Sequence, residues 1–90
     1  MEMSREQFED LESEGFNLRE DYSGRGMFGR DCLGLTGDVA DLVRFVQRIT
    51  DLEDQWSMDD TDWLLDIRSD NMGLGMIFYW PEVSVTKEVQ

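Results

Sequence analysis

Ninety residues set the size of one domain with a modest core, and an apolar content of 40% is enough to fill that core. The chain has 21 acidic and eight basic residues and no histidine, so its formal net charge is −13. This charge argues against direct binding to nucleic acid or anionic lipid, and it favours a basic protein as the partner.

The first expected element is a short helix over residues 5–14. Ser4 and Gln7 have the spacing of a capping box, in which the side chain of each residue accepts the backbone N–H of the other. Phe8 and Leu11 share one face, which anchors the helix to the core. The remaining surface is crowded with the carboxylates of Glu9, Asp10, Glu12 and Glu14.

Two strands of a hairpin follow, over residues 16–23 and 30–36. Apolar and polar side chains alternate in the first strand, and Leu33 and Leu35 share one face of the second. The loop between them, 24–29, has the glycine spacing G-x-G-x-x-G. In a dinucleotide-binding fold the last glycine leads into a helix, whereas here it leads into a strand, so nucleotide binding is the least favoured interpretation.

Two interpretations of the glycine loop remain open. It is either a wide turn in which glycine supplies a positive φ angle, or a contact site for a partner. Met27 and Phe28 are large apolar residues in this loop, and Arg25 and Arg30 flank them. Methionine, aromatic residues and arginine are enriched at protein interfaces, so we include these four residues in the candidate binding site.

The clearest helix spans residues 38–50. Asp38 is the expected N-cap, and Asp41 lies near the positive end of the helix dipole. The apolar residues recur at the spacing of a buried stripe. The expected stripe consists of Val39, Leu42, Val43, Val46 and Ile49.

Residues 51–62 show no sustained period and are expected to form an acidic connector. Its carboxylates lack the spacing of a calcium-binding loop, so we expect no metal requirement. They form either a solvated connector, with weak cation binding at most, or a row that imitates a phosphate backbone. The candidate binding residues here are Asp51, Glu53, Asp54, Asp59, Asp60 and Asp62. Residues 1–22 and 38–62 each carry eight acids and two bases, and we choose the connector because its six acids are closely spaced.

A second hairpin completes the predicted fold. Trp63, Leu65 and Ile67 alternate with other residues as in a strand, and the polar run that follows has the composition of a turn. The strand over 74–80 is apolar on both faces and is therefore expected at the sheet centre, ending at Pro81. The result is a single α+β domain: an antiparallel sheet of about four strands, with one main helix across it and a short N-terminal helix.

Catalysis has little support in these residues. A histidine base is absent, and Cys32 therefore has no histidine to activate it as a nucleophile. We expect a non-enzymatic protein without a cofactor. The single cysteine, the absence of a signal-peptide pattern and the lack of a long apolar run favour the cytoplasm, which would be the host cytoplasm for a phage-encoded protein.

The run from Tyr22 to Met27, with Gly29 and Cys32 after it, resembles a pattern of small proteins from bacteriophages and mobile elements. In size, acidity and lack of histidine the chain also resembles the anti-CRISPR inhibitors of phages. That resemblance implies an inhibitor that covers the nucleic acid groove of a Cas effector with an acidic surface.

The leading hypothesis is therefore an inhibitor of a basic, nucleic-acid-handling protein, such as a nuclease or Cas effector, acting as a monomer or homodimer. An immunity protein that neutralises a nuclease toxin would need the same electrostatics. A binder of an anionic nucleotide would need Arg25 and Arg30 to converge in a pocket. A structural phage protein, whose acidity serves solubility alone, is the third alternative.

Overall fold

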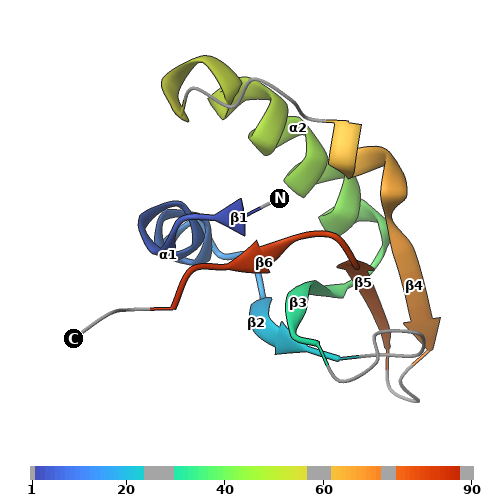
Figure 1. Ribbon diagram of the computed structural model, residues 1–90. Coiled ribbons are helices and arrows are strands. Elements are labelled where there is room, and N and C mark those ends of the chain that lie inside the picture. Colours follow the sequence, from blue (N-terminus) through green and yellow to red (C-terminus); the bar gives the residue numbers. More distant parts are fainter. Residues whose placement is uncertain (1, 24–29, 57–61, 72–74, 88–90) are drawn as a thin grey trace.

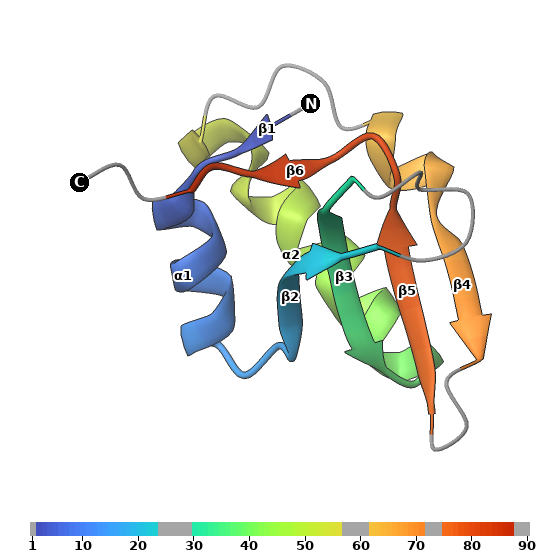
Figure 2. The same ribbon diagram turned by 60° about the horizontal axis from the view of Figure 1, so that its bottom comes forward.

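The centre of the molecule is an antiparallel sheet of four strands with one long helix across one face (Figures 1 and 2). The computed structural model describes residues 2–23, 30–56, 62–71 and 75–87. Its elements are β1 (Glu2–Met3), α1 (Arg5–Ser13), β2 (Leu18–Tyr22), β3 (Cys32–Gly37), α2 (Val39–Trp56), the 3-10 helix η1 (Asp62–Asp66), β4 (Arg68–Asn71), β5 (Met76–Trp80) and β6 (Ser84–Val85). The α+β class expected from the sequence is confirmed.

The strand order is β2-β3-β5-β4, which places β3 and β5 in the middle. Leu33 pairs with Trp80 at one end of their ladder, and Gly37 pairs with Met76 at the other. Side chains on both faces of β5 are buried, as its sequence predicts for a central strand, and Pro81 follows its last residue. The sheet therefore has apolar material on both sides, with α2 behind it in the view of Figure 2.

Helix α1 forms where its capping signal predicts. The Ser4 hydroxyl accepts the Gln7 backbone N–H at 3.1 Å, and the Gln7 side chain accepts the Ser4 backbone N–H at 3.0 Å. Phe8 and Leu11 are buried, as expected. Gly15, with φ of 100°, ends the helix in the left-handed region that side chains disfavour.

A second, two-stranded sheet joins segments from the two ends of the sequence. β1 and β6 pair in parallel, and the Thr86 backbone N–H donates to the Met3 carbonyl at 2.9 Å. Met3 and Val85 are buried at this junction. The sequence did not predict β1, because two residues are too few to show an alternating pattern.

Helix α2 begins with a reciprocal cap. The Asp38 carboxylate accepts the Asp41 backbone N–H at 3.0 Å, and Asp41 accepts the Asp38 N–H at 3.1 Å. The Asp38 backbone donor lowers the pKa of the Asp41 carboxyl. A Cβ on Gly37 would lie 2.4 Å from an Asp41 carboxylate oxygen, so this cap requires glycine at position 37.

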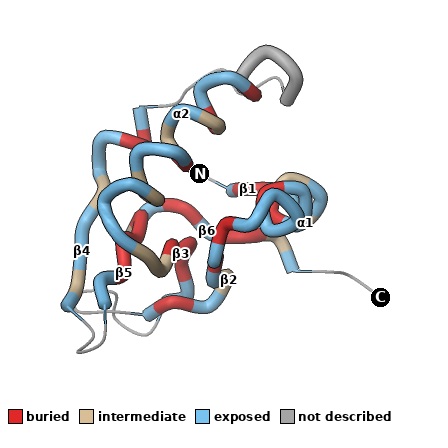
Figure 3. The backbone as a smooth tube through the Cα atoms, turned by 180° about the vertical axis from the view of Figure 1, so that it is seen from behind, coloured by how far each residue is buried: buried red, intermediate tan, exposed pale blue. Residues whose placement is uncertain are grey.

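The buried face of α2 matches the expected stripe in part. Ile49 is buried as expected, and Leu42 and Val46 are partly buried against the core. The prediction was wrong for Val39, which is 62% exposed, and for Val43, which is 49% exposed. Phe45 and Leu52 are buried instead, because the Phe45 ring packs against Phe16 and Trp80 and the two valines lie on the flank of the helix. Figure 3 shows this mixture of buried and exposed residues along α2.

Two further predictions after residue 50 were wrong. The first part of the expected connector is helical, because α2 continues to Trp56. The segment read as a strand from Trp63 is the 3-10 helix η1, in which Trp63 and the adjacent Leu64 are both buried and Leu65 is 83% exposed. Burial of two successive side chains is incompatible with the alternation of a half-buried strand.

Four aromatic rings form a continuous row through the main core. The Phe45 ring lies 5.4 Å from Phe16 and 5.2 Å from Trp80, measured between ring centroids. Trp63 lies 5.7 Å from Trp80. The row connects the segment after α1 with α2, β5 and η1.

The position of Phe45 predicts a large difference between two substitutions in α2. Phe45→Ala should lower the free energy of unfolding by about 3–5 kcal/mol, because it leaves a cavity between two rings. Val43→Ala, at a half-exposed position of the same helix, should change it by less than about 0.5 kcal/mol. Urea unfolding measures both; similar losses for the two variants would show that the buried face is assigned wrongly.

Candidate functional site

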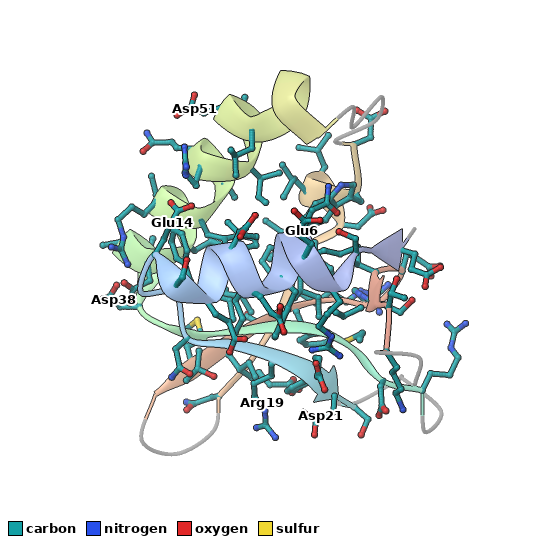
Figure 4. The ribbon with its side chains drawn as sticks, turned by 90° about the vertical axis from the view of Figure 1, so that its left-hand side faces the viewer. Glu6, Glu14, Arg19, Asp21, Asp38 and Asp51 are labelled. Atoms are coloured by element: carbon teal, nitrogen blue, oxygen red, sulfur yellow. The ribbon has the colours of Figure 1, made fainter. Side chains whose placement is uncertain are left out.

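The most distinctive surface of the molecule is a group of exposed carboxylates on α1 and the elements beside it, here called the acidic face. Figure 4 shows Glu6 on α1 and Glu14 at its end in front, Asp21 on β2 below, and Asp51 on α2 above. The acidic face consists of the exposed residues Glu6, Glu9, Asp10, Glu12, Glu14, Asp21 and Asp51. Three separate elements therefore supply one negatively charged side of the domain.

The arginines near this face are held by other groups. Arg5 pairs with Glu20 and lies over the Phe8 ring, 5.4 Å from its centroid. Arg44 pairs with Asp41 at 3.0 Å and lies 4.9 Å from the Phe16 centroid. Both side chains thus use their charge and their stems to fasten helices to the core.

Two more arginines neutralise individual members of the acidic face. Arg48 of α2 pairs with Glu14, and Arg19 lies 3.7 Å from Asp21. The structure gives no ion pair, within its described ranges, to the four remaining carboxylates of α1. These are Glu6, Glu9, Asp10 and Glu12.

The like charges along α1 are unfavourable for the helix itself. Glu6 and Asp10 are four residues apart, where like charges destabilise an isolated helix. The last turn contains no basic residue, so Glu12 faces the negative end of the helix dipole. α1 is therefore stabilised by its cap and its buried residues, while its outer surface carries charge at the expense of stability.

The connector predicted as the acidic site is divided by the fold. Asp51 is exposed on α2, and Asp62 is exposed in η1. Glu53 and Asp54 belong to the last turns of α2. Asp59 and Asp60 lie outside the described residues. The structure therefore brings Asp51 to the acidic face and does not join it with Asp62 in one described element.

The sequence indicated the acids of the first helix but did not identify Glu6 or Asp21 as part of a site. The excess of acids in residues 1–22 was a signal for both.

The structure describes the residues on either side of the glycine loop, whereas residues 24–29 lie outside the described ranges. β2 and β3 pair in antiparallel fashion, as the predicted hairpin requires. Arg25, Met27 and Phe28 lie outside the described residues, so the choice between a turn and a contact site stays open. Arg30 is exposed and borders a shallow depression of about 300 Å³ that is also lined by Asp31 and Glu82.

A second apolar cluster lies on the sheet face opposite α2. It consists of Tyr22, Cys32, Ile77 and Tyr79, and the two tyrosine rings stack with centroids 4.9 Å apart. The Tyr22 hydroxyl donates to Asp70, and burial together with this bond raises the tyrosine pKa. Burial also raises the pKa of the Cys32 thiol to about 11. The thiol is therefore protonated near neutral pH, which suits packing rather than nucleophilic chemistry.

The described residues contain no group of three or more Cys, Asp or Glu side chains placed to hold a metal ion. None of the described helices is long and apolar enough to cross a membrane.

Comparisons of the chain with protein-family models, with curated proteins and with solved structures find no match. The resemblance to anti-CRISPR proteins therefore remains a hypothesis, and the acidic face has to be judged on its own chemistry.

The end of α1 predicts opposite effects for two equivalent charge changes. Glu12→Gln should raise the free energy of unfolding by about 0.3–1 kcal/mol at low ionic strength, because it removes a negative charge from the negative end of the dipole. Glu14→Gln should lower it, because it breaks the ion pair with Arg48. Thermal unfolding at low and high salt measures both changes. Equal shifts would mean that the two carboxylates have the same environment.

The Cys32 pKa predicts a loss of stability at alkaline pH. The ordinary thiol pKa is 9.0, and the folded value is about 11. Above pH 9 the thiol ionises in the unfolded protein, while the buried thiol of the folded protein stays protonated. The stability that Cys32 contributes to the folded state is therefore fully present below pH 9 and is lost as the pH rises to 11.

Thermal midpoints across this window should therefore fall less for Cys32→Ala than for the unaltered protein. Iodoacetamide should alkylate Cys32 more slowly in the native protein than in urea at pH 9. Equal alkylation rates would contradict the burial of this thiol.

Proposed function

We propose that the protein is a non-enzymatic inhibitor that binds the basic nucleic acid groove of a nuclease or Cas effector through its acidic face. The carboxylates would occupy the positions that phosphates take in the nucleic acid complex. The partner's lysines and arginines would then be engaged, and nucleic acid would be excluded from the groove.

One observation carries this proposal: the four α1 carboxylates that make no ion pair in the described structure. Carboxylates neutralised within the fold would have little charge to offer, whereas these project from one helix. The like charges of Glu6 and Asp10, four residues apart, and Glu12 at the negative end of the dipole also weaken the helix that carries them. A binding role explains why charges are retained where they oppose stability.

The charge of the whole chain supports the same role. A net charge of −13 accelerates encounter with a basic partner, and this acceleration weakens as salt screens the charges. An immunity protein for a nuclease toxin would use the same surface, so the identity of the captured partner separates these two versions of the proposal.

The binding of an anionic nucleotide has less support. Arg30 is the described member of the arginine pair that this function requires. It shares its shallow depression with Asp31 and Glu82, whose carboxylates would repel a phosphate. The surroundings of Arg30 are therefore unfavourable for an anion.

The proposal predicts competition between this protein and nucleic acid for the same partner. We suggest a panel of purified Cas effectors and nucleases, each loaded with labelled nucleic acid and titrated with this protein at two ionic strengths. A target should release its nucleic acid, and higher salt should weaken the inhibitor. Simultaneous binding of both ligands, or insensitivity to salt, would contradict electrostatic mimicry.

Two triple variants locate the surface responsible. Glu9→Gln, Asp10→Asn and Glu12→Gln together should weaken inhibition roughly 3- to 150-fold, at about 0.2–1 kcal/mol for each exposed pair. The matched control combines Asp31→Asn, Asp66→Asn and Glu82→Gln, three exposed acids outside the acidic face. Both variants remove the same formal charge. Equal losses would show that net charge, rather than the acidic face, governs binding.

A further inference from the structure

The sheet has two dissimilar edges. At one edge, α1 lies beside β2 (Figure 2). At the other edge is β4, which pairs with β5 and with no other strand that the structure describes. An edge strand presents a row of backbone N–H and C=O groups that can pair with a further strand. The edge at β4 is thus the natural place for the sheet to be extended.

An uncovered apolar strip lies beside this edge. Val39 and Val43, one helical turn apart on α2, are 62% and 49% exposed, and Met76 of β5 is 38% exposed. Val39 and Met76 border a groove of about 320 Å³, together with Gly37, Asp38, Asn71 and Gly75. The groove therefore runs between the start of α2 and the end of the sheet.

The composition of β4 explains why this strip is uncovered. Ser69 pairs with Phe78, and Asn71 pairs with Met76, so both residues lie on the sheet face that carries α2. They are too small and too polar to cover the neighbouring valines. A strand added beyond β4 would place alternate side chains on this same face, against the flank of α2.

We propose that the β4 edge and the flank of α2 bind an extended segment of a partner protein, which adds to the sheet as a fifth strand. Every second residue of this segment is apolar and contacts the strip formed by Val39, Val43 and Met76. The backbone of β4 supplies hydrogen bonds that do not depend on sequence, and the strip supplies selectivity for alternate apolar side chains.

Charge argues for a partner rather than a second copy of this chain. Asp38 lines the groove, and Asp66 lies two residues before β4. Arg68 and Asp70 of β4 lie on the opposite sheet face, where Asp70 accepts the Tyr22 hydroxyl. Two copies with a net charge of −13 each would repel one another at such an edge. The bound segment therefore carries a net positive charge.

This surface is separate from the acidic face, because α1 and β4 lie at opposite edges of the sheet (Figure 2). The inference goes beyond the proposed inhibition and does not depend on it. A protein with both surfaces would engage a basic groove on one side and capture an extended basic segment on the other.

A library of random octapeptides displayed on phage tests the inference. Peptides selected on the 90-residue chain should have apolar residues at alternate positions and a net positive charge. The double variant Val39→Ser, Val43→Gln changes exposed positions, so it should remain folded and should bind the selected peptides about tenfold more weakly. The triple variant of the acidic face, Glu9→Gln, Asp10→Asn and Glu12→Gln, should bind them within about twofold of the unaltered protein, because each distant charge contributes little.

Two N-methylated versions of the best peptide test strand pairing directly. Methylation of the amides on one edge should abolish binding, whereas methylation on the other edge should preserve it, because only one edge pairs with β4. Backbone amide shifts in NMR spectra should concentrate on residues 68–71 and on the valines of α2.

Three results would overturn the inference. The first is a selection without enrichment, or with peptides that bind the double valine variant equally well. The second is a pair of methylated peptides that behave alike. The third is a dimer of the free protein that the valine variant dissociates, because a second copy would then be the occupant of this edge.

Discussion

The contact of Phe45 with Phe16 and Trp80 is the interaction on which the rest of the molecule depends. A domain with a net charge of −13 is opposed by its own electrostatic repulsion, so its stability rests on apolar burial. The described part of the chain buries no charged side chain. The aromatic row thus fills the interior, and the carboxylates remain on the surface, where solvent screens them.

The comparison of sequence with structure shows where local patterns suffice. The cap of α1 and the central position of β5 follow from neighbouring residues, and both were predicted. α2 has two overlapping apolar stripes at helical spacing, one that includes Val39 and Val43 and one that includes Phe45 and Leu52. Periodicity cannot rank two such stripes. The choice depends on the volume available against Trp80, which only the assembled sheet defines.

The sequence predicted the acidic character of the candidate site, but not which carboxylates form it. Counting carboxylates along the chain gave two equal lobes, because a count ignores which charges are paired within the fold. The structure separates them: Arg48 engages Glu14, whereas Glu9 and Glu12 on the same helix have no such partner in the described structure. It also adds Asp51 of α2, which is distant from α1 in sequence. The fold therefore determines which carboxylates have an ion pair and which can interact with a partner.

The parallel ladder between β1 and β6 has a consequence for the order in which the domain is built. Glu2 and Thr86 meet across a separation of 84 residues, and closing so long a loop is entropically unfavourable until the intervening chain is ordered. On the ribosome, α1 emerges early, yet the strand that holds Met3 in place is synthesised late. A nascent chain therefore displays the carboxylates of α1 well before it can hold them in their final arrangement. Recognition that depends on that arrangement, rather than on charge alone, begins only after β6 has been synthesised.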